Sequence, residues 1–78
     1  MNVIGETVTV VTSHDPGKVG MSGLVLLETA KTLVVKGGGR TFRVEKEGSV
    51  FRLSASGEVL VGSDLAGRLE DRLGRRSR

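Results

Sequence analysis

The stretch TLVVKGGGRTFRVEK, residues 32–46, contains the pattern that decides the fold. The glycines at 37–39 lie between two runs of strand-forming residues, and glycine supplies the positive-φ corners of a tight hairpin. Beyond them, apolar and polar residues alternate, which predicts a strand with Phe42 and Val44 facing inward and Arg43 facing outward. The stretch therefore predicts a β-hairpin with one buried face.

Strand patterns continue on both sides of this hairpin. Residues 6–12 are rich in β-branched side chains and alternate, with Val8 and Val10 facing inward. Residues 23–28 are apolar on both faces, so we expect a strand that is covered on both sides and pairs with 32–36. Two further alternating runs, separated by a two-residue turn at Ser56-Gly57, predict strands at residues 50–55 and 58–62.

These runs predict six short strands within about residues 6–62 of a single all-β domain that spans 1–78. An open sheet of six strands would leave one face bare in so small a chain, so the sheet must bend strongly. We therefore expect a small Sm-like or SH3-like antiparallel barrel.

The pattern changes after residue 62. The spacing of Leu65, Leu69 and Leu73 is helical, and charged residues occupy the other positions, so we expect a short amphipathic helix over about 65–73. A basic tail at 74–78 follows.

Composition excludes several classes of function. The chain has no cysteine and a single histidine, which excludes disulfides, thiolate nucleophiles and zinc ribbons. No apolar run approaches the roughly 20 residues that cross a bilayer, so we expect a soluble cytoplasmic protein without membrane contact. Twelve Lys and Arg against nine Asp and Glu give a net charge of +3, which favours an anionic polymer as partner.

Two patterns resemble catalytic motifs but do not support catalysis. Ser13, His14 and Asp15 are neighbours on one turn, where they cannot align as nucleophile, base and orienting group. The glycines at 17, 20 and 23 lead into a strand, whereas a phosphate-binding loop leads into a helix. We expect no catalytic residue, and no metal or cofactor bound by the protein.

Cations at loop tips and outward strand positions are candidate RNA contacts. Folding can gather them into a stripe that matches phosphates, and ordinary solvated faces account for them about equally well. Phe42 and Phe51 fall on apolar faces, so we expect them in the core rather than in a base-stacking platform. The candidates from charge alone are Lys18, Lys36, Arg40, Arg43 and Arg75.

Several segments together resemble the archaeal and eukaryotic ribonuclease P protein component 1 family. Glu28-Thr29-Ala30-Lys31-Thr32-Leu33 is similar to the family's Glu-Thr-x-Asn-Thr-Leu hairpin. The ending at residues 62–73 is similar to its Gly-x-x-Leu-x-Gly-Arg-Pro-Glu-Asp-Arg block. Further matching segments are Ile4-Gly5, residues 19–25, and Val44-Glu45-Lys46 followed by Phe51.

This resemblance implies an RNA-binding subunit that stabilises the catalytic RNA of ribonuclease P during removal of the tRNA 5′ leader. It implies Mg²⁺ on the RNA, indirect contact with pre-tRNA, and ribonuclease P protein component 4 as a partner. Family members carry helical sequence before the barrel that helps to dock component 4, whereas only Met1 to Val3 precede it here.

The resemblance assigns RNA contacts to Lys46, Arg68 and Arg72. We expect partner docking by Leu65, Leu69, Glu70, Asp71 and Leu73.

Two other functions are compatible with the residues. The spacing of Gly20, Gly23 and Val25 is also typical of KOW-type SH3-like barrels in ribosomal and transcription proteins. An apolar strand edge or C-terminal helix that binds another chain would make this a protein-docking module, with positive charge serving solubility.

Overall fold

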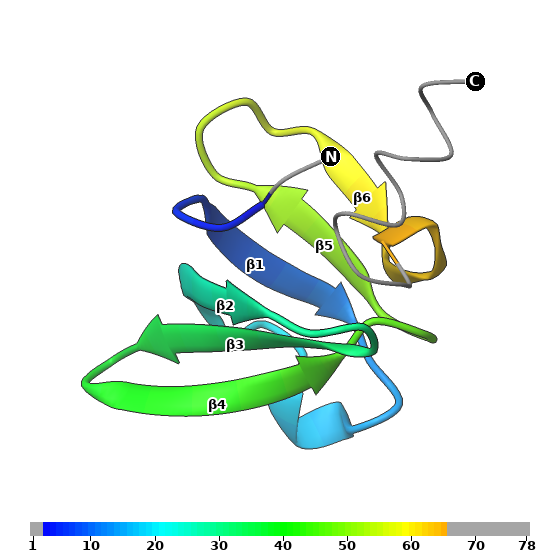
Figure 1. Ribbon diagram of the computed structural model, residues 1–78, viewed down its shortest axis with the longest axis horizontal. Coiled ribbons are helices and arrows are strands. Elements are labelled where there is room, and N and C mark those ends of the chain that lie inside the picture. Colours follow the sequence, from blue (N-terminus) through cyan, green and yellow to red (C-terminus); the bar gives the residue numbers. More distant parts are fainter. Residues whose placement is uncertain (1–2, 66–78) are drawn as a thin grey trace.

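The computed structural model describes residues 3–65, which form one strongly curved antiparallel sheet with two short 3₁₀ helices (Figure 1). No helix among these residues has the length and apolar character needed to span a membrane. The elements in chain order are β1 (Thr7–Thr12), η1 (Pro16–Lys18), β2 (Ser22–Glu28), β3 (Thr32–Gly37), β4 (Arg40–Glu45), β5 (Val50–Leu53), β6 (Val59–Val61) and η2 (Gly62–Leu65).

The predicted hairpin is confirmed as β3 and β4. Val35 lies opposite Phe42, and Gly37 lies opposite Arg40, so the turn consists of two residues. These residues, Gly38 and Gly39, have φ values of 62° and 77°. Positive φ at both turn positions matches the right-handed twist of the strands, which is why glycine occurs here.

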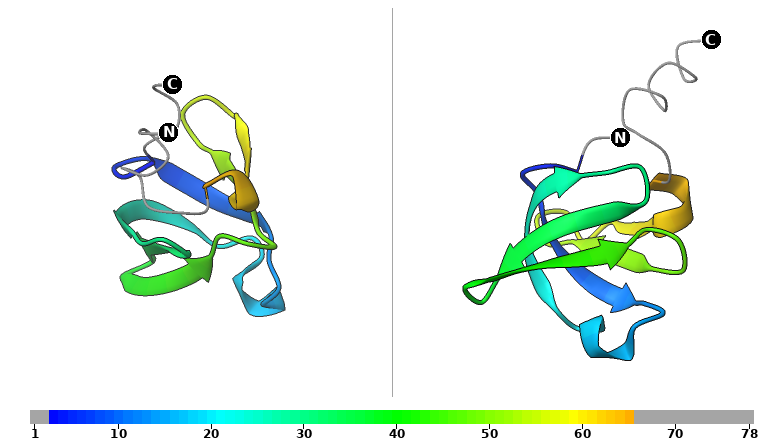
Figure 2. Two further views of the ribbon diagram at one scale, coloured as in Figure 1. Left: turned by 45° about the vertical axis from the view of Figure 1, so that its right-hand side comes forward. Right: turned by 60° about the horizontal axis from the view of Figure 1, so that its bottom comes forward.

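The six strands lie in the order β4-β3-β2-β1-β5-β6. β2, β3 and β4 form a local meander, whereas β1 pairs with both β2 and the distant β5. The sheet curls so that the β3–β4 hairpin faces the β5–β6 half across the interior (Figure 2). The all-β, six-stranded antiparallel class is therefore confirmed, and the curvature is barrel-like.

The core fills the concave face of the sheet. Val8 and Val10 from β1, as predicted, pack in one buried cluster with Val35, Val44 and other side chains. Phe51 is fully buried, and Phe42 packs partly buried against the same cluster, so both phenylalanines belong to the core as predicted.

The expectation that both faces of residues 23–28 are covered was wrong. Of the apolar side chains in this segment only Val25 is buried, while Leu24, Leu26 and Leu27 are 41%, 43% and 53% exposed. The register of β2 against β3 shifts between Val25 and Leu27, which identifies a β-bulge. The extra residue in a bulge shifts the alternation of inward and outward side chains by one position. After Val25, the next side chain to point inward is therefore that of Glu28.

The two sheet edges meet at one end without pairing. Among residues 3–65, no ladder joins β4 to β6. At the end of β6, Gly62 N–H donates to the Ser49 carbonyl at 2.7 Å. A Cβ atom on Gly62 would lie only 1.6 Å from the Lys46 carbonyl oxygen, so backbone meets backbone here.

The last strands are shorter than predicted. β5 ends at Leu53 and β6 covers only Val59–Val61, so a five-residue loop replaces the two-residue turn. Leu65 belongs to η2, while the rest of the predicted helix and the tail at 74–78 lie outside the described residues.

Candidate nucleic-acid interface

Three cations gather at the outer face and edge of the β3–β4 hairpin, and we call them the basic hairpin surface. The core pairs Leu33–Val44 and Val35–Phe42 point inward, so side chains at the intervening positions point outward. The surface consists of Lys18, Lys36 and Arg43.

Lys36 and Arg43 are diagonal neighbours on the outer face of the hairpin. Lys36 lies opposite Thr41, and Arg43 is two residues further along β4. Diagonal positions on antiparallel strands are roughly 7–8 Å apart, within reach of long side chains acting on one ligand. Arg40, opposite Gly37 at the start of β4, is also exposed, but it is in phase with Phe42 and Val44 and so lies on the other face of the hairpin.

Lys18 reaches the same surface from η1. The Asp15 side chain caps this short helix by accepting from Gly17 N–H at 3.0 Å. Lys18 Nζ then donates to the backbone carbonyl of Arg43 and lies 3.9 Å from Asp15 Oδ2. The loop is thereby held against the β4 edge, and the ammonium lies beside Arg43.

The basic hairpin surface ends at an acidic residue at the far end of β4. Glu45 is exposed, lies opposite Thr32, and shares the outer face with Arg43. A carboxylate there repels phosphate. The positive charge of the outer face is therefore concentrated at Lys36 and Arg43, on the side of Glu45 nearer the hairpin tip.

The predicted RNA contact at Lys46 is contradicted by the structure. Its side chain is 0% exposed, and Nζ donates to Glu28 Oε2 at 2.7 Å inside the fold. Lys46 is in phase with the inward residues Phe42 and Val44, a signal that the sequence contained. Glu28 carried no such signal, because the bulge in β2 shifts the alternation before it.

The predicted docking role of Leu65 is also contradicted. Its side chain is 3% exposed and belongs to the hydrophobic core, because η2 folds back over the end of β6. The remaining predicted contacts lie outside the described residues: Arg68, Leu69, Glu70, Asp71, Arg72, Leu73 and Arg75.

The turn at Ser13-His14-Asp15 uses its polar groups for local structure. Ser13 Oγ accepts from Asp15 N–H at 3.1 Å, and Asp15 Oδ1 accepts from Gly17 N–H. The glycine-rich segment passes through η1 into β2, as its interpretation as a turn required. In the part of the chain from 3 to 65, no group of three or more His, Cys, Asp or Glu residues could hold a metal ion.

Comparison with known proteins gives one consistent result. Residues 1–75 match the family model described as Ribonuclease P/MRP, subunit p29. Ribonuclease P protein component 1 from Sulfurisphaera tokodaii is 32% identical over 74 residues, covering 92% of this chain and 96% of the relative. The Thermofilum pendens protein of the same name is 44% identical, covering 95% and 83%. The solved structure of Mth11, a homologue of human RNase P protein Rpp29, superposes with a TM-score of 0.64 at 33% identity and covers 92% of this chain and 97% of that one.

Proposed function

Because this chain belongs to the ribonuclease P/MRP subunit p29 family, we propose that it binds and stabilises the catalytic RNA of ribonuclease P. The observation that carries the proposal is the basic hairpin surface, where three cations from η1, β3 and β4 lie together. The surface lies on a hairpin whose inner face is anchored in the core, so its cations are held on a rigid element.

The chemistry of these side chains suits contact with the RNA backbone. The guanidinium group of Arg43 can donate two parallel hydrogen bonds to one phosphate, and Lys36 adds a point charge. Phosphate contacts position a protein without reading sequence. Folded RNA is recognised mostly by its shape, phosphates and 2′-hydroxyls. We therefore expect the protein to select RNA by its folded shape and not by its sequence.

In this proposal the protein breaks no bond. The RNA holds Mg²⁺ and removes the 5′ leader of pre-tRNA, while this subunit steadies the RNA that contacts the substrate. Ribonuclease P protein component 4 is the proposed protein partner, and the complex works in the cytoplasm.

The test is a titration of folded ribonuclease P RNA and an equal-length control RNA across a salt series. We expect tight binding to the first RNA, with affinity falling as salt rises because released counterions drive association. Arg43→Ala should weaken this binding and lower the slope of log K against log salt by about 1. Arg52→Ala is the matched control, since Arg52 is an exposed arginine on β5, distant from β4 in the strand order.

Arg52→Ala should leave both affinity and slope unchanged. If both variants lost the same RNA affinity, positive charge would contribute equally at both places, and the basic hairpin surface would not be the site. Equal weak binding to both RNAs would overturn the proposal and favour the KOW-type or protein-docking alternative.

A further inference from the structure

The two edges of the sheet differ in how they are protected. At the β4 edge, the side chains include Arg40, Arg43 and Glu45, and charged side chains discourage strand addition. The carbonyl of Arg43 also accepts a hydrogen bond from Lys18 Nζ. This edge is therefore occupied by the protein's own charges.

The β6 edge has the opposite character. The Leu53 N–H donates to the Glu58 carbonyl, and the Gly62 N–H donates to the Ser49 carbonyl. Residues 58, 60 and 62 therefore direct their backbone groups toward β5. In an antiparallel ladder the intervening residues direct theirs away. Val59 and Val61 thus present N–H and C=O groups at the edge, and their side chains are 57% and 48% exposed.

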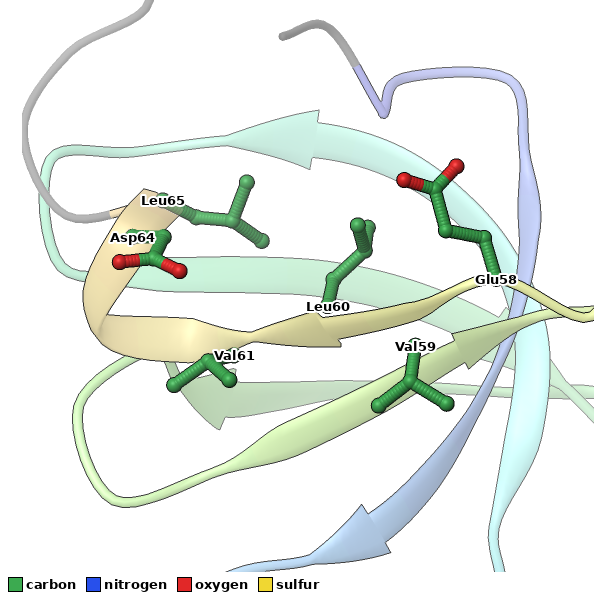
Figure 3. A pocket seen from close by; sticks show the side chains of 6 residues that line it. All are labelled: Glu58, Val59, Leu60, Val61, Asp64 and Leu65. Carbon is green, nitrogen blue, oxygen red and sulfur yellow. The ribbon is translucent and has the colours of Figure 1, made fainter.

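A pocket of about 280 Å³ lies along this edge. Figure 3 shows Glu58 and Leu60 on one side of β6, together with Leu65 from η2, and Val59 and Val61 on the other side. Exposed carboxylates of Glu58 and Asp64 lie beside apolar side chains. The six lining residues are Glu58, Val59, Leu60, Val61, Asp64 and Leu65.

We propose that the β6 edge docks an extended segment of a partner protein in which apolar and basic side chains alternate. The added strand would bond to the backbone groups of Val59 and Val61, which supplies affinity. Its apolar side chains would cover Val59 and Val61 on one side of β6, and a Lys or Arg on the other side would meet Glu58 and Asp64. These carboxylates repel phosphate, so charge complementarity selects a protein over RNA.

This proposal rests on the proposed function in one respect. It takes the partner protein to be another subunit of the same ribonucleoprotein. β4 and β6 are the two edge strands of the sheet, and the chain after β4 approaches the end of β6 where Gly62 lies against Lys46. One subunit would therefore contact RNA through β4 and protein through β6.

The test is site-directed photo-crosslinking in ribonuclease P reconstituted from its purified RNA and protein subunits. The full chain contains no cysteine, so Val59→Cys can be labelled at one position with a thiol-directed benzophenone. We expect this probe to crosslink to a partner protein, at a segment that contains a Lys or Arg between apolar residues. Thr41→Cys is the matched control on the β4 edge, where we expect RNA crosslinks.

Charge reversal supplies the second measurement. On the Val59→Cys background, Glu58→Lys together with Asp64→Lys should lower the crosslink yield roughly tenfold or more, because like charges oppose docking. Glu47→Lys, at an exposed acid outside the pocket, should not lower it. Crosslinking of Val59→Cys to RNA, to residues 66–78 of the same chain, or to nothing would overturn the proposal.

The affinity for RNA, measured on the same samples, separates this proposal from the proposed function. The Glu58→Lys and Asp64→Lys change should leave the salt slope of RNA binding intact while the protein crosslink is lost. If Arg43→Ala leaves RNA affinity unchanged, the RNA proposal fails whatever the Val59→Cys crosslinks show.

Discussion

Lys46 and Glu28 form an ion pair in the interior of the fold, with side-chain exposures of 0% and 1%. The pair joins the end of β2 to the residue after β4, where Lys46 N–H also donates to the Lys31 carbonyl at 2.7 Å. Two segments that resemble family motifs therefore meet through this ion pair inside the protein.

We expect Lys46→Met to destabilise the protein by about 3–5 kcal/mol, because it leaves a carboxylate buried without its lysine. Glu28→Leu combined with Lys46→Met should restore most of that loss, because neither charge then has to be desolvated. Urea unfolding followed by far-UV circular dichroism measures both, since the chain has no Trp or Tyr. A double variant as unstable as the single one would contradict this explanation.

Gly62 is required because two backbones approach each other there. An added Cβ would meet the Lys46 carbonyl oxygen at 1.6 Å and the Ser49 carbonyl oxygen at 2.8 Å. We expect Gly62→Ala to lower the free energy of unfolding by about 1–3 kcal/mol through overpacking. Gly17→Ala, where the nearest atom is the Asp15 carboxylate at 3.3 Å, should change it by less than about 0.5 kcal/mol. Equal effects on the urea midpoint would contradict the close approach.

At the scale of elements, the β3–β4 hairpin supports the proposed RNA site. Its inner face contributes Leu33, Val35 and Val44 to the core, and its outer face carries Lys36 and Arg43. The turn at Gly38 and Gly39 sets the register that places these residues.

Gly38→Val should therefore cost about 1–2 kcal/mol, because a β-branched residue is disfavoured at the φ of 62° found there. Gly38→Asn should be close to neutral, since asparagine tolerates positive φ. For a chain of this size, 1 kcal/mol corresponds to a shift in melting temperature of roughly 4–8 °C. Equal melting temperatures for the two variants would rule out this turn geometry.

At the scale of the whole molecule, local and distant pairings coexist in one sheet. The meander of β2, β3 and β4 needs only short loops, whereas β1 pairs with β5 across more than half of the described chain. Distant pairing is slow because the loop must close before contacts form. We infer that the meander forms before β5 docks on β1.

This order predicts different kinetic effects for two core substitutions. Val35→Ala, within the meander, should slow folding, whereas Phe51→Leu, on β5, should mainly accelerate unfolding. Stopped-flow circular dichroism across a urea series gives both rates. If Phe51→Leu folded more slowly than Val35→Ala, the inferred order, in which the meander forms before β5 docks on β1, would be reversed.

The basic hairpin surface combines what the sequence predicts with what only the fold provides. Outward positions on an alternating strand predict the exposure of Lys36 and Arg43. The position of Lys18 beside Arg43 results from η1 folding against β4, which no local pattern indicates. The sequence left an apolar strand edge open as a docking surface, but only the strand order identifies β6 as an edge strand.

The sequence by itself determined the all-β class, the six strands, the glycine turn and the inward position of Val8, Val10, Phe42 and Val44. These features depend on side-chain alternation and turn chemistry, which act over a few neighbouring residues. Only the tertiary structure decided the burial of Lys46 and Leu65, the exposure of the β2 leucines and the unpaired β6 edge. Those features depend on a β-bulge and on which distant strands pair, because burial results from contacts between segments far apart in the chain.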